Sequence, residues 1–397
     1  MERLRLNNGQ RERLDAFLRD LVCIPSFSTR EDLVAERVAV EMERLGFRDV
    51  RTDRIGNVIG WVGADSGPIL MLNGHMDTVD VSDGSKWTRE PFGGEIEDGR
   101  LYGLGACDMK GGLAAMIHGA HLLHRMEAEL AGRVVVACVV QEEPCEGISS
   151  RVLIEEEGVE PDWVVIAEPT DLQVSRGQRG RIELRVTTHG RSAHASQPAL
   201  GENAIYTASR LVFGLELLAG QLGDDPFLGK GTLAVTEIRS SAGSRNAIPD
   251  RCELIVDRRL TLGETEAMAL AEVQRVIARE GVRADVAVTE YVATSHTGYP
   301  CRAREYYPPW VIEEDHPLVT ALVQAARAQL GRRPRIGYWN FSTEGTYTAG
   351  EAGIPTVGFG PGDPNHAHTA DESVLLDDVA AATGVYAQLA AELIGFR

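Results

Sequence analysis

The chain has 397 residues, which is long enough for two or more domains around a large core. Its formal net charge is −19, from 59 acidic and 40 basic side chains, and this argues against nucleic acid binding because phosphates attract basic surfaces. Apolar residues make up 43%, yet no run reaches the roughly 18 unbroken apolar residues of a membrane helix. We therefore expect a globular protein with neither a nucleic acid nor a membrane partner.

The N-terminal segment and the cysteines both predict a cytoplasmic protein. The first 22 residues are charged throughout and lack the apolar core of a secretory signal peptide. The six cysteines form no CxxC pair, which favours reduced, structural thiols. Cys107 and Cys145 lie beside acidic residues, but small buried side chains remain the better interpretation than metal ligands.

Helical and strand patterns alternate along the first part of the chain. Helices are predicted at 10–22, 31–46 and 109–126, and strands at 57–63, 68–74, 133–141 and 161–170. Short apolar runs separated by helices are typical of a mostly parallel sheet that is covered on both faces. Residues 1–178 are therefore predicted to form the first segment of a large α/β domain.

The pattern changes after residue 178, where 180–190 alternates apolar and polar residues as a strand with one solvent-exposed face does. A helix, two strands, a helix and a last strand are predicted at 203–222, 231–240, 251–260, 264–280 and 284–293. This order predicts a smaller α+β, ferredoxin-like lid and dimerisation domain over 179–294. A helix at 315–331 and a buried strand at 354–360 then predict that 295–397 completes the large domain.

Histidines and carboxylates follow the apolar runs of the large domain. Each run is followed by such side chains, and a Gly-rich turn carries one more: His75 and Asp77, Asp108, Glu142 and Glu143, Glu168, and finally His366 and His368. In open α/β sheets the ligand crevice lies outside the carboxyl ends of the strands, so we expect these groups to meet at one edge of the sheet.

Clustered carboxylates at such an edge require cations, because Asp and Glu are rarely buried without a partner. Nitrogen and oxygen ligands without thiolate suit Zn²⁺, Co²⁺ or Mn²⁺. The candidate ligands exceed the needs of one catalytic zinc ion. The pattern thus predicts two divalent ions, about 3.5–4 Å apart, that share a bridging carboxylate.

Five segments carry a family resemblance: GHMDTVD, GACDMKGG, EEPCEG, AEPT and HAHTADE. In this order they resemble the signature blocks of a dinuclear zinc metallopeptidase and deacylase family, which includes acetylornithine deacetylase, succinyl-diaminopimelate desuccinylase, carboxypeptidase G and aminoacylase. The blocks span nearly the whole chain. RGQRGR, FLGKGT, DRRLTLGET and FSTEGTY further resemble a subgroup of hydrolases linked to selenium metabolism by genomic association, which identifies no substrate.

The resemblance implies a role for each matching residue of the metal centre. The implied ligands are His75 and Glu168 on one metal, Glu143 and His368 on the second, and Asp108 bridging both. Asp77 would orient the ring of His75, and Glu142 would be the general base. Spacing alone does not decide which of Glu142 and Glu143 is the base, and the HTADE context selects His368 over His366.

The smaller domain contributes further candidates through the same resemblance. His194 would stabilise the oxyanion in the active site of a partner subunit, and Asn246 would contact the substrate. Arg259 would bind a substrate carboxylate, for which the bidentate guanidinium is suited. A solvated loop histidine and an ordinary salt bridge remain the alternatives for His194 and Arg259, and Arg258 could be confused with its neighbour.

We expect a metal-dependent hydrolase that cleaves an amide bond of a small N-acylated amino acid or short peptide. A dipeptidase or carboxypeptidase on the same site is the open alternative, and a non-catalytic metal-binding protein on this scaffold is a further one. Barrel amidohydrolases also use a His-x-His pair, but here the pair lies near the C-terminus and eight strand–helix units are lacking. The histidines at 118, 121 and 124 are predicted to line a solvated helix edge.

Overall fold

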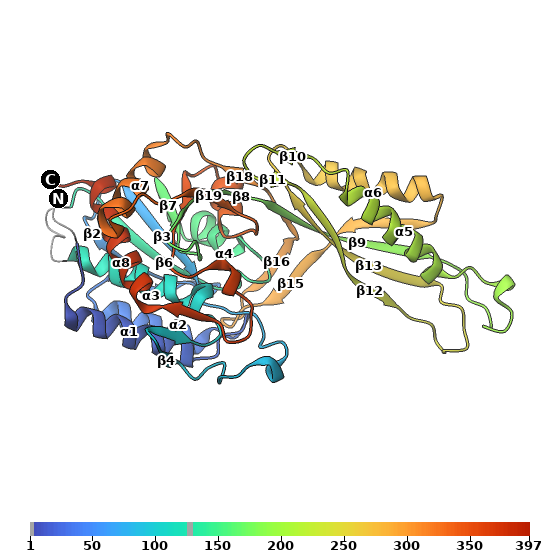
Figure 1. Cartoon of the computed structure of the whole chain (residues 1–397), viewed down its shortest axis with the longest axis horizontal. Helices are drawn as coiled ribbons and strands as arrows, with labels where there is room; N and C mark the ends of the chain where they lie inside the picture. The colour runs from blue at the N-terminus through green and yellow to red at the C-terminus, as the bar shows by residue number, and fades with distance from the viewer. Residues whose placement is uncertain (1–3, 125–129) are drawn as a thin grey trace.

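The computed structural model describes residues 4–124 and 130–397. Figure 1 shows an elongated molecule with a large α/β body at one end and a smaller sheet covered by two helices at the other. The helices are α1 (Asn8–Cys23), α2 (Asp32–Arg44), α3 (Gly111–Leu123), α4 (Ile148–Arg151), α5 (Ala204–Ala219), α6 (Glu266–Glu280), α7 (Pro317–Leu330) and α8 (Leu376–Ile394). Among the described residues, no helix combines the length and apolarity needed to cross a membrane.

The large domain is built on a nine-stranded sheet. In spatial order its strands are β1 (Arg48–Thr52), β2 (Val58–Gly63), β6 (Arg133–Val139), β3 (Ile69–His75), β7 (Trp163–Ile166), β20 (Thr356–Gly358), β8 (Val174–Gln178) and β18 (Trp310–Val311), with β19 (Ile336–Trp339) also paired to β8. The four central strands β6, β3, β7 and β20 run parallel, while the outer pairs β1–β2, β2–β6, β20–β8 and β8–β18 are antiparallel. The predicted mostly parallel central sheet is confirmed, with antiparallel strands at its margins.

Both faces of this sheet are buried, which explains the unbroken apolar runs. Along β6, Val134 and Val136 belong to the main core under the helices, whereas Val135, Ala137 and Val139 belong to a second cluster on the opposite face. Helices α1, α2, α3, α7 and α8 contribute to the main core. The sheet is therefore a rigid platform for whatever its strand ends carry.

The smaller domain has its own hydrophobic core and sheet. Its strands are β9 (Gly180–His189), β12 (Thr232–Ser240), β13 (Arg251–Leu260), β14 (Ala284–Val288) and the short β17 (Tyr306–Tyr307). The order β12-β13-β9-β14 is all antiparallel. Read from β14, it places the fourth, first, third and second strands of the unit side by side, as a ferredoxin-like fold requires. We call this unit the lid. Its boundaries at 179 and 294 stay a proposal, and the short β17 pairs with the start of β9 from outside them.

Short hairpins link and flank the two sheets. They are β4 (Glu95–Glu97), β5 (Arg100–Tyr102) and β21 (Ser373–Leu375) as one small sheet, β10 (Asp224–Asp225) with β11 (Gly229–Lys230), and β15 (Glu290–Thr294) with β16 (Pro300–Arg304). The single strand predicted over 284–293 is thus two strands. The chain leaves the lid sheet at Thr289, after which β15 pairs with β16 instead of β9.

Candidate metal centre

Parallel pairing brings the ends of three strands to one edge of the large sheet. Asn73 on β3 lies opposite Ala137 on β6 and Ile166 on β7, and His75 lies opposite Val139. The chain segments that leave β6 and β7 at this edge carry the predicted acidic side chains, namely Glu142, Glu143 and Glu168. The register of the strands therefore determines which side chains can meet.

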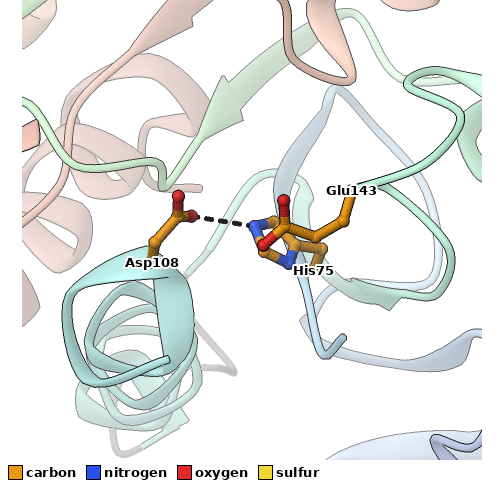
Figure 2. A group of neighbouring side chains, drawn as sticks. All are labelled: His75, Asp108 and Glu143. Carbon is orange, nitrogen blue, oxygen red and sulfur yellow. Dashed lines mark hydrogen bonds and ion pairs between the residues drawn. The ribbon is translucent and has the colours of Figure 1, made fainter. Parts of the chain in front are cut away.

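The imidazole of His75 contacts two carboxylates through the same nitrogen. Its Nε2 lies 3.0 Å from Oδ1 of Asp108 and 3.4 Å from Oε1 of Glu168. Figure 2 shows His75, Asp108 and Glu143 converging from separate segments of the chain. Glu142 is slightly further away, with Oε2 3.9 Å from the same Nε2.

A second imidazole approaches the other side of Asp108. Nε2 of His368 lies 3.3 Å from Oδ2 of Asp108 and 3.1 Å from Oε2 of Glu143. The two oxygens of Asp108 therefore face different histidines. His366 and His368 are both exposed, but the cavity described below is lined by His368 and not by His366.

These side chains have strongly perturbed proton affinities. Burial lowers the pKa of His75, but the surrounding Glu168, Asp108 and Glu142 carboxylates outweigh burial and raise it well above its usual value. Hydrogen bonds to Asp108 and Glu143 raise the pKa of His368 to about 11. The surrounding carboxylates thus favour positive charge at both imidazoles, and a bound cation would supply such charge instead.

The direction in which the pKa of each carboxylate shifts depends on its neighbours. Burial raises the pKa of Glu142 well above its usual value, and the charges of Glu168 and Glu146 add to this, against the opposing effect of His75. Burial, with Asp108 nearby, likewise raises the pKa of Glu168. Burial also acts on Asp108, but its hydrogen bonds to the two histidines lower its pKa overall.

The residues offer donors for divalent metal ions by chemistry as well as by position. Ligand atoms of His75, Asp108 and Glu143 lie within 4.8 Å of one another, as do those of His75, Glu142 and Glu168. All donors are imidazole nitrogen or carboxylate oxygen, which suits Zn²⁺, Co²⁺ and Mn²⁺. Cys107 and Cys145 are buried thiols whose pKa values are raised by burial, as expected of structural cysteines.

Asp77 contacts this cluster through two different groups, its backbone carbonyl and its carboxylate. Its backbone carbonyl accepts a hydrogen bond from Nδ1 of His75 at 2.9 Å, whereas its carboxylate oxygen Oδ1 is 3.7 Å from that nitrogen. The carboxylate accepts the backbone N–H groups of Glu142 and Glu143, at 3.1 and 3.2 Å, and the hydroxyl of Ser28 at 2.7 Å. Asp77 thus joins the histidine ligand to the paired glutamates.

Glu372 is a positioning residue that the sequence analysis did not single out. This buried carboxylate accepts the backbone N–H groups of Cys107 and Asp108, at 2.8 and 3.0 Å, and so fixes the turn that carries Asp108. Glu372 is the last residue of the HAHTADE segment, which also supplies His368. Its place in this segment was the feature of the sequence that could have identified it. Gly112 lets the start of α3 approach the end of β7, because a Cβ there would lie 2.2 Å from the carbonyl oxygen of Ala167.

A cavity of about 390 Å³ opens beside the cluster, between the large domain and the base of the lid. Its walls are Asp108, Glu142, Glu143, Glu146, Glu168, Arg181, Arg259, Phe341, Ser342, Pro364, Ala367 and His368. The structure separates the two adjacent arginines of the lid. Arg259 lines the cavity and pairs with Asp257 at 2.8 Å, whereas Arg258 is buried within the lid against Glu264 and Glu272.

His194 and Asn246 lie together, but away from this cavity. Both are exposed, and the backbone N–H of Ala195 donates to the carbonyl of Asn246 at 2.7 Å. His194 belongs to the loop that follows β9, and Asn246 to the loop between β12 and β13; these loops lie at the end of the lid distant from the large domain (Figure 1). Nδ1 of His194 contacts only the neighbouring Ser196 among its described hydrogen bonds. Within one chain, these two residues are not brought to the cluster of His75, Asp108, Glu168 and His368.

The comparison with protein families decides the classification. A model of the peptidase family M20/M25/M40 matches residues 71–392. The chain belongs to this family. It is therefore a metal-dependent hydrolase, and the predicted resemblance to dinuclear metallopeptidases and deacylases is confirmed at the family level.

Individual relatives of this M20 protein align with nearly the full length of its chain. The uncharacterized protein YgeY of Escherichia coli (strain K12) is 40% identical over 374 residues, which cover 94% of this chain and 92% of that protein. Succinyl-diaminopimelate desuccinylase of Rhodospirillum centenum is 29% identical, with 94% and 95% covered. A dinuclear metal binding peptidase of the M20 family from Bacillus subtilis shares the fold, with a TM-score of 0.71, 17% identity, and 98% and 99% covered.

Proposed function

We propose that this M20 hydrolase cleaves the amide bond of a small N-acylated amino acid or short peptide that carries a free carboxylate. The observation that carries the proposal is the position of Asp108, whose two oxygens face His75 and His368, with Glu142 beside the first histidine. One carboxylate placed between two imidazoles supplies donors for a pair of divalent ions.

The proposed ligand set follows these contacts. His75 and Glu168 would hold one ion, Glu143 and His368 the other, and Asp108 both. Zn²⁺ fits this donor set best, and Co²⁺ or Mn²⁺ are compatible with it. When bound, such ions polarise a carbonyl group and lower the pKa of water toward neutrality.

Glu142 is the proposed general base. Its carboxylate is buried at the cavity wall and lies beside His75 without making that ring's shortest contacts. In the proposed reaction it accepts a proton from the attacking water and then donates this proton to the amine that leaves.

Arg259 is the proposed partner of the substrate carboxylate. It reaches the cavity from the lid, and its contact with Asp257 leaves the side chain 26% exposed. A guanidinium group can bind a carboxylate through two parallel hydrogen bonds. A substrate held there would span the gap between the lid and the metal-ligand cluster.

We further propose that the protein is a homodimer in which His194 and Asn246 serve the partner's site. On α5, Tyr206, Phe213 and Leu217 share one helix face and are 71%, 67% and 61% exposed. Exposed apolar faces of this kind mark protein interfaces. A lid that pairs in this way could bring the distant His194 to a second active site, where it would stabilise the oxyanion.

The experiment that tests the function is a substrate screen on protein supplied with Zn²⁺, Co²⁺ or Mn²⁺. The panel contains N-acyl amino acids, dipeptides and carbamoyl compounds, and metal content is measured on the same samples. Hydrolysis of the acylated amino acids supports a deacylase, while cleavage confined to dipeptides supports the dipeptidase or carboxypeptidase alternative. Two tightly bound metals without hydrolysis of any panel member would contradict the proposal and favour a non-catalytic metal-binding protein.

A further inference from the structure

Glu146 occupies an unusual position on the wall of the proposed active-site cavity. It follows the Glu142–Glu143 pair along the same loop, lines the cavity with them, and is buried, with 9% of its surface exposed. Its Oε1 accepts hydrogen bonds from the hydroxyl of Ser342 at 2.6 Å and from Nη1 of Arg181 at 3.3 Å. Its Oε2 is buried and has no hydrogen-bond partner among the described residues.

An unpartnered carboxylate oxygen in a buried position costs free energy. Such atoms in native proteins need a physical explanation, for which a bound ligand is one candidate. The proposed metal ligands do not provide it, because among the described residues the side chain of Glu146 is hydrogen-bonded to Ser342 and Arg181 and not to His75 or His368. Glu146 lines this cavity and also a neighbouring one beside Arg151 and Tyr307, and we seek the group that would satisfy Oε2 in the first of them, next to the reacting groups.

The charges around Arg181 indicate the sign of that group. Arg181 is shared among four carboxylates, at distances of 3.2–3.8 Å: Glu146, Glu183, Asp257 and Glu305. The second cation of the cluster, Arg259, contacts Asp257, which is already one of the four. Two guanidinium groups thus face four carboxylates, and three carboxylates remain even if Glu305 is protonated. The cluster carries an excess of negative charge next to the reacting groups.

We propose that Glu146 binds a primary ammonium group of the substrate, so that the enzyme selects substrates carrying both a carboxylate, for Arg259, and a cation. This inference rests on the proposed function and names its substrate class. An ammonium group offers three donors on a compact cation, and a charge-assisted hydrogen bond to Oε2 would satisfy the unpartnered oxygen. The ammonium could be the free α-amine of a dipeptide or the side-chain amine of an acylated basic amino acid.

Two matched substrate pairs separate these sources. N-acetyl-L-ornithine and N-acetyl-L-norleucine differ by a terminal ammonium in place of a methyl group. L-alanyl-L-alanine and isobutyryl-L-alanine differ in the same way at the α-position. Affinities are measured by calorimetry on the metal-supplied Glu142→Ala variant, which should not turn them over, and are compared with those of the Glu142→Ala/Glu146→Gln double variant.

The expected result is that the charged member of one pair binds about 10- to 100-fold more tightly than its neutral partner, as a hydrogen bond between charged groups provides. The double variant should bring this ratio close to one. Glu183→Gln in the same background is the matched control, because it removes another acid beside Arg181 that does not line the cavity, and it should preserve the ratio. The pair that shows the preference identifies the source of the ammonium.

Equal binding of charged and neutral members in both pairs, or no binding of either, would overturn the inference without any reference to turnover. A preference that survives Glu146→Gln would assign the cation to another acid and would also overturn it. The proposed function is judged separately, by hydrolysis in the wild-type protein. Charged ligands that bind through Glu146 but are never hydrolysed would contradict amide hydrolysis while supporting the subsite.

Discussion

His75 donates a hydrogen bond from Nδ1 to the backbone carbonyl of Asp77, at 2.9 Å, and not to the Asp77 carboxylate. The carboxylate is thereby free to accept the backbone N–H groups of Glu142 and Glu143. The aspartate of the GHMD segment consequently fixes two things at once: the ring orientation of one proposed ligand, and the loop that carries both the proposed base and a ligand of the second ion.

Asp77→Asn should therefore impair both halves of the centre. The amide nitrogen would meet N–H donors that need an acceptor, so the loop at 142–143 should shift while the backbone contact to His75 remains. We expect a loss of about 10- to 100-fold in metal affinity or in activity, as is typical for residues that support metal ligands. Metal titration and kcat/KM report the effect, and Asp80→Asn, which changes an exposed acid three residues away, is the control. Unchanged affinity and activity would show that the carboxylate contacts are dispensable.

Glu142→Ala tests which of the two adjacent glutamates is the general base and which is a metal ligand. If Glu142 is the base, the variant should keep two metal ions per chain while kcat falls by about 10²–10⁴-fold. Glu143→Ala, by contrast, should lose one ion, because Glu143 contacts His368. Elemental analysis beside steady-state kinetics distinguishes the two. Loss of an ion from the Glu142 variant would mean that the two roles are exchanged.

Arg259→Ala should weaken substrates with a free carboxylate far more than their amides or esters. The reason is that the guanidinium lines the cavity, and its partner Asp257 is also held by Arg181. Arg258→Ala gives the contrasting result. Removing this buried cation leaves Glu264 and Glu272 uncompensated, so we expect a loss of about 3–5 kcal/mol of stability. An equal loss on acids and amides for Arg259→Ala, with a lower melting temperature, would instead indicate a structural salt bridge.

Glu305 should make the stability of the protein depend on pH near neutrality. Burial raises the pKa of Glu305 from 4.5 to about 7, despite the attraction of Arg181. The folded chain thus binds more protons than the unfolded chain between these values, and the free energy of unfolding falls as pH rises from about 4.5 to about 7. Glu305→Gln should remove this slope, so that the variant gains about 2–3 kcal/mol over the wild type between pH 5 and pH 8. Urea unfolding at both pH values measures the difference, with Glu290→Gln, which changes an exposed acid, as control. A variant that follows the wild type across this range would contradict the prediction.

The sequence predicted which side chains meet at the sheet edge because strand ends are local features, whereas their roles as metal ligands stay a proposal. An apolar run followed by His or Glu identifies both a buried strand and what leaves it, and parallel pairing then brings His75, Glu143 and Glu168 to one edge. Contacts that depend on tertiary packing were not predictable in this way. The carboxylate of Asp77 reaches a loop 65 residues further along the chain, and Glu372 supports Asp108 across 264 residues.

Sequence periodicity also gave two wrong predictions, because the same period occurs in more than one structural environment. The strand predicted over 284–293 is two strands, because an alternating pattern does not specify which partner a strand pairs with. The prediction of a solvated helix edge for the histidines at 118, 121 and 124 is wrong for His118. It is buried, with its ring centroid 5.7 Å from that of Phe17 and Nε2 3.4 Å from Oε1 of Glu41. Helices α1 and α2 pack against that edge of α3. A spacing of three residues does not show whether other helices pack there.

His194 provides the sharpest test of the proposed dimer, because its loop lies at the far end of the lid from the metal-ligand cluster of its own chain (Figure 1). Glu142→Ala and His194→Ala are prepared separately, each is confirmed to be inactive, and their subunits are then exchanged. If His194 acts in the partner's site, a mixed dimer has one site without either group and one site with its own Glu142 and an intact His194 from the other subunit. Random exchange should then restore activity at roughly one site in four.

The same mixture gives a different result if His194 acts within its own chain. Every site would then lack one of the two groups, and mixing would restore nothing. The control is Ser196→Ala mixed with Glu142→Ala. It removes the hydroxyl next to Nδ1 of His194 but keeps the imidazole, so sites that retain Glu142 should stay active before and after exchange. Exchange demonstrated by mass labelling without recovery of activity would contradict a role in the partner's site. It would leave the ligand set of His75, Asp108 and His368 unaffected, because those contacts lie within one chain.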